Sequence, residues 1–248
     1  MTELLAMHQT NHIDDANLAY GEAQDQMALL PNYYAWIARR FRDVTRGTVL
    51  DLGCGQGAVI GHYLSHCERV IAVDVNLELL RLVSAQFDPT RVVVRQADLR
   101  GDWREISDIT ADVVLALDVI EHFEDDNEFV TKMKSRLKKG GSVVVKVPAQ
   151  SKLYGEIDRA SGHWRRYDNA QLATLFERQG FTTRSLRSMN PIGAWAYRMR
   201  RNQKTNFSKT YSRTKLRLGN LAMPLLSLLD CIPGAGGLSL VGIFDSNE

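Results

Sequence analysis

The sequence predicts an α/β protein built on a mostly parallel β-sheet that carries helices on both faces. Short apolar runs recur along the chain, and stretches of about 10–15 residues with apolar residues at helical spacing separate them. Strands that alternate with helices of this length form βαβ units, in which successive strands are parallel. The 248 residues are enough for one large domain, and 24% charged residues with only 18 Gly and 6 Pro exclude disordered and fibrous classes.

The expected elements follow one another in a regular order. A helix should begin at Pro31–Asn32, where YYAWIARRFRDV has apolar residues at helical spacing, and residues 1–30 should add one or two short helices. The expected strands are residues 48–52, 70–75, 91–94, 112–117, 142–147 and 237–244. The expected helices are residues 57–65, 77–87, 125–139 and 169–180, and the Gly140–Gly141 pair is expected to cap the third of them.

Residues 190–236 interrupt this alternation with basic helical material. The net charge of the chain is +2, but residues 181–248 hold ten Lys and Arg against three Asp and Glu, a net of +7 that leaves −5 for the rest. Such a surplus is typical of a solvated face, and it also suits an anionic substrate, a nucleic acid or a membrane surface.

The apolar residues 221–244 are long enough to cross a membrane. However, Asp230, two prolines and four glycines argue against a continuous lipid-facing helix, so an amphipathic helix and a core strand are expected, with peripheral membrane contact at most. The N-terminus has no secretory-signal pattern, and Cys54, Cys67 and Cys231 contain no CxxC pair. These features predict a cytoplasmic protein.

A glycine-rich turn carries the strongest functional signal. In VLDLGCGQG, residues 49–57, an apolar strand ends at Asp51, and Gly53, Gly55 and Gly57 follow. Glycines let the backbone approach a ligand closely and tolerate a positive φ. The spacing G-x-G-x-G departs from the dinucleotide pattern G-x-G-x-x-G, and an acid two residues before the first glycine suits a ligand ammonium better than a diphosphate. The turn therefore favours a ligand with an amino-acid moiety.

Further polar residues follow the next strands. VIAVDVN places Asp74 at a strand end, where a carboxylate can accept from both ribose hydroxyls. Asp74 could instead cap the next helix, but Asn76 can also serve as that cap. Asp98 follows the third strand, where it could reach an adenine edge, and Asp118, Glu121 and His122 follow the fourth. Ligands of open α/β sheets bind at these C-terminal strand ends.

Together these stretches make the sequence resemble the class I S-adenosylmethionine (SAM)-dependent methyltransferases, and within them a bacterial group of small-molecule methyltransferases. NYYAWIARRF, LKKGGSVVVKVPA, LYGEIDRASGHWRRYD and GLSLVGIF extend the resemblance over residues 32 to 244. It implies a Rossmann-like sheet of seven strands with the last one antiparallel. It further implies SAM on the glycine turn and beside Asp118, with Asp74 and Val75 at the ribose, Asp98 and Leu99 at the adenine, and Tyr33 and Tyr34 over the cofactor.

The same resemblance divides the chain into a SAM-binding core and two added segments. The core is residues 47–189 and 237–248, and residues 1–46 and 190–236 are expected to form a helical lid and an acceptor cap. Polar residues after the fourth and fifth strands are the acceptor candidates. His122, His163 and Tyr154 are candidates for catalysis, and Arg165, Arg166 and Tyr167 for substrate binding, although a structural hydrogen bond or ion pair is an equally good explanation for several of them.

The function expected from these features is transfer of a methyl group from SAM to oxygen or nitrogen of a small molecule, and the clustered cations suit an anionic one. Two alternatives stay open: an enzyme that transfers the aminocarboxypropyl arm or releases methylthioadenosine, and a non-catalytic module that binds SAM or nucleic acid. Only Phe207 and Tyr211 lie among the cations of residues 198–217, which is a weak pattern for base stacking, so no nucleic acid is expected. No metal ion is expected either.

Overall fold

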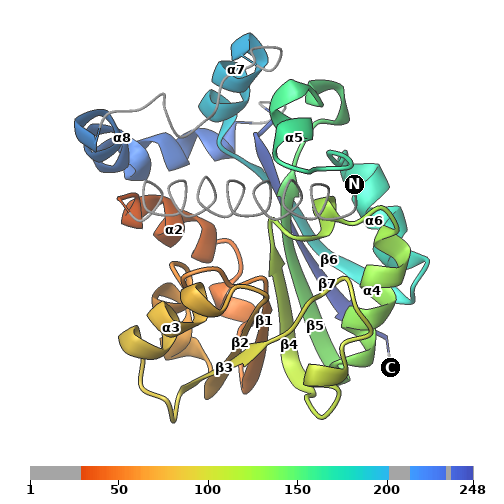
Figure 1. Ribbon diagram of the computed structural model, residues 1–248. Helices are drawn as coiled ribbons and strands as arrows, with labels where there is room; N and C mark the ends of the chain where they lie inside the picture. The colour runs from red at the N-terminus through yellow and green to blue at the C-terminus, as the bar shows by residue number, and fades with distance from the viewer. Residues whose placement is uncertain (1–28, 201–212, 233–235, 248) are drawn as a thin grey trace, which may run out of the picture.

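A computed structural model describes residues 29–200, 213–232 and 236–247 and contains a seven-stranded sheet (Figure 1). The strand order is β3-β2-β1-β4-β5-β7-β6. Strands β1 to β5 pair with one another in parallel, and β7 is antiparallel to both β5 and β6. The predicted fold class is therefore confirmed. The strands are β1 Thr48–Leu52, β2 Arg69–Asp74, β3 Val92–Gln96, β4 Ala111–Leu117, β5 Leu137–Pro148, β6 Phe181–Met189 and β7 Ser239–Ser246.

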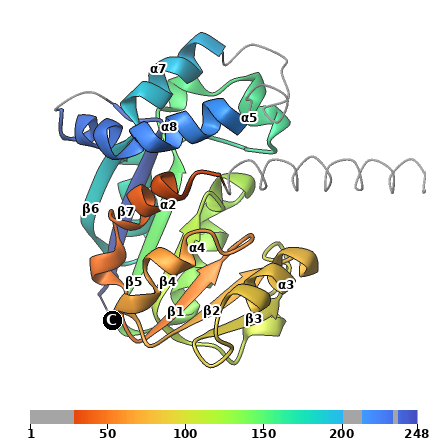
Figure 2. The ribbon, with the colours of Figure 1, turned by 90° about the vertical axis from the view of Figure 1, so that its left-hand side faces the viewer.

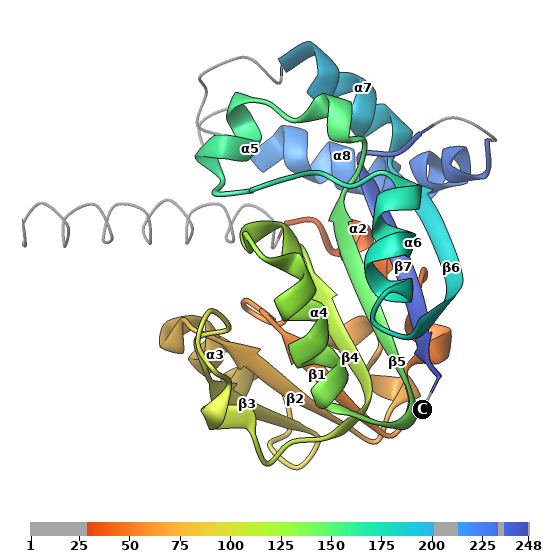
Figure 3. The same ribbon diagram turned by 90° about the vertical axis from the view of Figure 1, so that its right-hand side faces the viewer.

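Helices cover both faces of the sheet and enclose a buried layer on each side (Figures 1 and 3). Helices α2 (Pro31–Ala38) and α3 (Leu77–Gln86) pack on one face, where Trp36 and Val83 join a buried cluster with the strand residue Val113. Helices α4 (Asp126–Ser135) and α6 (Asn169–Glu177) pack on the other, where Phe129 and Phe176 join the second cluster. The burial of apolar side chains on both sides stabilises the sheet and fixes where its strands end.

Helices α5 (Glu156–Ala160), α7 (Pro191–Arg200) and α8 (Arg213–Leu226) lie together beyond the C-terminal ends of the parallel strands (Figures 1 and 2). Between the regular elements the chain forms short 3₁₀ turns: η1 Arg42–Val44, η2 Ile60–His62, η3 Leu64–His66, η4 Arg104–Ile106, η5 Ile120–His122, η6 Ser151–Leu153 and η8 Ser227–Cys231.

Polar residues at the helix starts explain why several elements begin where they do. The Asn76 side chain accepts from the backbone N–H groups of Glu78 and Leu79, as expected, and so caps α3. Asp125 caps α4 through the N–H of Glu128. Such a cap stabilises a helix by about 1 kcal/mol. Because Asn76 caps α3, the neighbouring Asp74 is not needed for that purpose.

Two expected elements differ in the structure. Residues 57–65 form the turns η2 and η3 instead of an α-helix, because Gly61 and the β-branched Val59 and Ile60 favour an α-helix poorly. The helix expected over 125–139 ends at Ser135, and the glycine pair lies in β5. There the pairing with β4 jumps from Ala111↔Leu137 to Val113↔Ser142, and Gly140 has φ +68°. The pair therefore forms a bulge and not a helix cap.

The N-terminal helix and the segment after β6 contact each other. The Asp230 carboxylate, which has no exposed side-chain surface, accepts from Trp36 Nε1 at 2.7 Å and from the Asn190 backbone N–H at 2.8 Å, and it pairs with Arg40. Asn32 bonds Asn220 of α8 through both its backbone and its side chain. The expected short helices before residue 29 lie outside the described residues, so the division into lid, core and cap stays a prediction. No described helix is long and apolar enough to cross a membrane.

Candidate cofactor and acceptor site

The glycine turn after β1 has the backbone conformation that its sequence predicts. Gly53, Gly55 and Gly57 all have positive φ, at 69°, 55° and 76°. The N–H groups of Gly53 and Cys54 donate to the carbonyl of Val73 at 2.8 and 3.0 Å, which holds the turn against the end of β2. A Cβ at Gly53 would lie 2.7 Å from Val119 Cγ2. The turn therefore needs glycine at position 53 for both its conformation and its space.

Two buried carboxylates flank this turn. Tyr63 donates its hydroxyl to Asp51 Oδ2 at 2.6 Å, and Asp74 accepts from the N–H groups of Gly55 and Asn76, both at 2.9 Å. Burial raises the pKa of Asp51 to about 7, despite the bond from Tyr63, and it also raises the pKa of Asp74. Neither carboxylate forms an ion pair with a described residue. A ligand that brings an ammonium group and hydroxyl donors would compensate both.

An exposed valine follows Asp74, and an aspartate and a leucine follow β3. The Val75 side chain is 59% exposed directly after the acid, whereas Leu99 is buried. Asp98 is exposed, and its Oδ1 accepts from the Arg100 N–H at 2.9 Å, which leaves its other oxygen open to solvent. These residues could hold a flat ring with a polar edge.

A lysine that the sequence motifs did not indicate joins the ends of β4 and β5. Lys146 Nζ contacts both oxygens of Asp118, at 2.6 and 2.5 Å, and Asp118 has φ +57°. The Tyr33 hydroxyl lies close to Lys146 and Ser239, and burial raises the pKa of Tyr33. This contact brings α2 to the C-terminal end of the sheet, with Tyr33 and Tyr34 5.9 Å apart between ring centroids. The signal that could have found Lys146 is its position as the one charge in VVVKV.

The candidate catalytic residues lie around η5. His122 and His163 meet edge to face, with ring centroids 4.7 Å apart, and Tyr154 donates its hydroxyl to the His163 carbonyl at 2.8 Å. Burial, together with the neighbouring His163, lowers the pKa of His122 to about 4. His122 is therefore neutral at pH 7 and a weak base. A catalytic role for these three residues stays a prediction.

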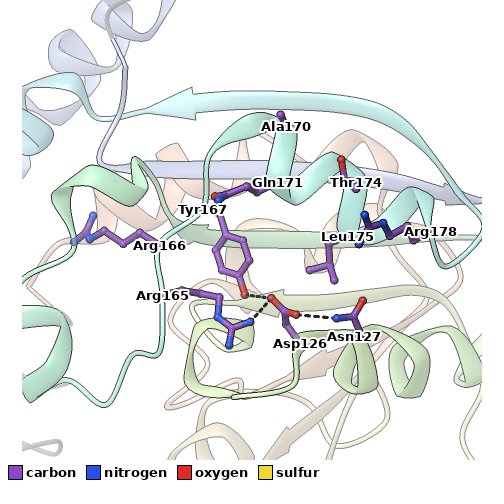
Figure 4. Close-up of a pocket in the computed structure, with 10 residues that line it drawn as sticks. All are labelled: Asp126, Asn127, Arg165, Arg166, Tyr167, Ala170, Gln171, Thr174, Leu175 and Arg178. Atoms are coloured by element: carbon purple, nitrogen blue, oxygen red, sulfur yellow. Dashed lines mark hydrogen bonds and ion pairs between the residues drawn. The ribbon is translucent and has the colours of Figure 1, made fainter.

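The candidate acceptor residues are already engaged by the protein (Figure 4). Arg165 forms an ion pair with Asp126 at 2.7 Å, and Tyr167 donates to the same carboxylate at 3.1 Å. In the view of Figure 4, Arg166 points away from this pair. Its guanidinium is buried against Asp158, with Nε 2.9 Å from both carboxylate oxygens. These contacts give Arg166 and Tyr167 structural roles, and binding of an acceptor by them stays a prediction that the geometry does not favour.

The comparison with known proteins identifies the family. A family model described as a methyltransferase domain matches residues 23–186. The chain belongs to the class I SAM-dependent methyltransferases. This methyltransferase is 30% identical over 135 residues to a probable SAM-dependent methyltransferase of Mycolicibacterium smegmatis, covering 54% of the chain and 51% of the relative. It is 27% identical over 110 residues to a ubiquinone biosynthesis O-methyltransferase of Rickettsia felis, covering 44% of each chain.

The chain thus spans about half the length, or less, of the curated relatives it matches. Among solved structures, a SAM-dependent methyltransferase from Mesorhizobium loti superposes with a TM-score of 0.58 at 17% identity, covering 86% of this chain and 97% of that one. That likeness concerns the fold alone. SAM is the cofactor of the family.

Proposed function

We propose that this methyltransferase transfers the methyl group of SAM to an oxygen or nitrogen atom of a small molecule held beneath the cap helices. The observation that carries the proposal is the pair of buried carboxylates Asp51 and Asp74 at the glycine turn, neither of which has an ion-pair partner among the described residues. The cap helices α7 and α8 and the N-terminal helix α2 converge at the same end of the sheet (Figure 2). A cofactor on the turn would therefore lie at the end of the sheet where these helices gather.

In this proposal the chain binds SAM and the acceptor, orients them toward each other and excludes water. Asp51 takes the ammonium group, Asp74 and Val75 hold the ribose, and Asp98 and Leu99 flank the adenine. Tyr33 and Tyr34 cover the cofactor from α2, where aromatic faces stabilise positive charge. Bound SAM supplies a methyl group that its sulfonium already activates. The rate then comes from alignment and from exclusion of water, so the protein needs no nucleophile of its own.

The acceptor is proposed to be a small, anionic molecule. Arg165 and Arg166 are paired with Asp126 and Asp158, so support comes from the cap, where Arg198, Arg213 and Arg217 lie with no described acid in α7 or α8. We also propose that the protein is located in the cytoplasm. The three free cysteines are consistent with a reducing compartment.

Product analysis tests the proposed chemistry. The protein is incubated with SAM and pools of small metabolites, and both products are analysed by mass spectrometry. S-adenosylhomocysteine (SAH) together with a metabolite heavier by one methylene supports the proposal. Methylthioadenosine would instead indicate transfer of the aminocarboxypropyl arm or cyclisation. SAM binding with neither product, or retention on nucleic acid that salt abolishes, would indicate a binding module.

Peripheral contact with an anionic membrane is a second proposal, and it rests on α8. None of the residues of α8 is buried. Leu218, Leu221 and Leu225 of α8 and Leu228 of the following turn η8 repeat at intervals of three or four residues with large exposed fractions, 75% for Leu221 and 70% for Leu225. Arg213 and Arg217 lie on the same helix. An exposed apolar stripe with adjacent cations is typical of helices that lie in an anionic membrane interface.

Vesicle sedimentation tests this membrane contact. The full chain should sediment with phosphatidylglycerol vesicles and not with phosphatidylcholine vesicles, and Leu221→Ser with Leu225→Ser should reduce the bound fraction several-fold. The exposed substitutions Leu77→Ser and Leu82→Ser on α3 serve as the matched control, because both side chains are also exposed. Equal binding by both double variants would exclude α8 as the contact.

A further inference from the structure

A carboxylate and two imidazoles converge beside the end of β4. Glu121 and His122 belong to η5, and His163 lies in the loop between α5 and α6. One ligand atom from each of the three lies within 4.8 Å of the other two. The backbone N–H of Trp164 donates to the Glu121 carbonyl at 2.8 Å, which ties the loop to η5 and holds the three side chains together.

Glu121 has no partner for its charge. The residue is 0% exposed, and neither carboxylate oxygen has a hydrogen-bond partner within the described part of the chain. The cations closest to it are committed elsewhere, because Lys146 pairs with Asp118 and Arg166 pairs with Asp158. A buried carboxylate without a partner costs several kilocalories per mole unless a cation or a proton compensates it. The orphaned oxygens therefore require either a bound cation or a proton.

The two histidines are oriented as metal ligands usually are. His163 Nδ1 lies 3.3 Å from Asp158 Oδ1, and that carboxylate also accepts from Arg166 and from Tyr197 at 2.7 Å. One nitrogen of His122 is hydrogen-bonded to the backbone of Gly162. Each ring therefore has one nitrogen held by the protein and one left over. A carboxylate or carbonyl behind a ligating imidazole fixes the ring and raises its basicity.

We propose that Glu121, His122 and His163 bind a divalent transition-metal ion. Two imidazoles and one carboxylate suit Zn²⁺, Mn²⁺, Fe²⁺ or Co²⁺ better than Mg²⁺ or Ca²⁺, which prefer oxygen ligands. Three protein ligands leave coordination positions open. This inference replaces the expectation from sequence that the protein binds no metal.

The role of this ion rests on the proposed function. The site lies at the C-terminal end of β4, the end of the sheet at which the cap helices gather. A metal-bound hydroxyl group of the acceptor loses its proton more easily and is held in one place. That role would remove the need for a general base.

Cobalt binding tests the site directly. The untagged full-length protein is stripped with a chelator and titrated with Co²⁺, whose visible absorption reports imidazole ligation, and dialysis with metal analysis gives the stoichiometry. We expect one Co²⁺ per chain, with at least a tenfold loss of affinity in Glu121→Gln and in His163→Gln. The exposed His66→Gln is the matched control and should bind like the wild type. SAH calorimetry on every metal-free variant verifies that it is folded.

The outcomes separate this site from the proposed function. Two results would overturn the metal site: equal Co²⁺ affinity in the wild type and the folded His163→Gln variant, or no bound Co²⁺ in the wild type. In either case a protonated Glu121 explains the buried carboxyl group. His163 is only half-buried, so its variant remains informative even if Glu121→Gln does not fold. Co²⁺ binding without SAH binding in the wild type would contradict the proposed function and leave the metal site standing.

Discussion

At the scale of single residues, we predict that Asp51 couples cofactor binding to pH. Its pKa of about 7 in the ligand-free fold lies above the ordinary value of about 4. Asp51 therefore destabilises the ligand-free fold progressively as pH rises from about 4 to about 7. Below pH 7 the cofactor's ammonium group must displace a proton from this carboxyl group. Binding should consequently weaken as the pH falls.

Calorimetry with SAH checks this pH dependence. We expect the affinity to fall by up to about tenfold per pH unit below pH 7, with release of close to one proton measured in buffers of different ionisation enthalpy. Asp51→Asn should bind weakly at every pH and release fewer protons. An affinity that stays constant from pH 8 to pH 5.5 would show that Asp51 does not meet the ammonium group.

The glycine turn offers a second prediction at the same scale. Gly53→Ala places a Cβ 2.7 Å from Val119 Cγ2 at a residue with φ +69°, so both the conformation and the space oppose it. We expect a fall in stability of about 1–3 kcal/mol and a loss of SAH binding. Gly61→Ala is the control, because its Cβ would meet only Phe87 at 3.8 Å. Urea unfolding and calorimetry compare the two, and equal behaviour would refute the argument.

At the scale of elements, Asp230 holds α2 to the end of the cap. Its buried carboxylate bonds Trp36 and the Asn190 backbone and pairs with Arg40. Asp230→Ala leaves the Arg40 charge without its partner, and removing one side of a buried pair costs about 3–5 kcal/mol. We expect this loss in urea unfolding, with faster amide exchange in residues 31–38 and 213–231.

The exposed ion pair between Arg42 and Asp43 provides the control for the Asp230→Ala variant. The Asp43 side chain is 83% exposed, so Asp43→Ala should change stability by less than about 0.5 kcal/mol. If Asp230→Ala is as stable as this control and exchanges at the same rate, α2 and the cap are held by other contacts.

At the scale of the whole molecule, the lid expected in residues 1–46 predicts an effect of bound SAH on amide hydrogen exchange. Tyr33 lies close to Lys146 at the strand ends, and α2 contacts α8 on its other side. A cofactor on the glycine turn should therefore order α2, and SAH should slow amide exchange at least several-fold in residues 31–38. Helix α6, on the opposite face, is the internal reference. Equal exchange in α2 with and without SAH would show that the helix is no lid.

Much of the core could be predicted from the sequence because its determinants are local. Buried parallel strands need continuous apolar runs, and a strand that ends in Asp51 before three glycines specifies its own turn. The two elements predicted wrongly lie where the local helix propensity is weak or where a neighbouring strand determines the backbone conformation. Residues 57–65 have apolar spacing but poor helix formers, and Gly140 serves a bulge that exists only because β4 lies beside β5.

The candidate site also has one part that the sequence predicts and another part that only the tertiary structure decides. Asp51 and Asp74 lie at the C-terminal ends of their own strands, so the apolar pattern and the parallel topology are enough to place both acids at one edge of the sheet. The surroundings of Asp118, Arg166 and Glu121 depend on contacts between distant segments. Lys146, which pairs with Asp118, comes from the next strand, and His163, which lies near Glu121, comes from a loop beyond it. Periodicity carries no information on such pairs, because each is decided by how the packed elements bring side chains together. The tertiary structure therefore made Arg166 a structural residue and left Glu121 buried without a partner.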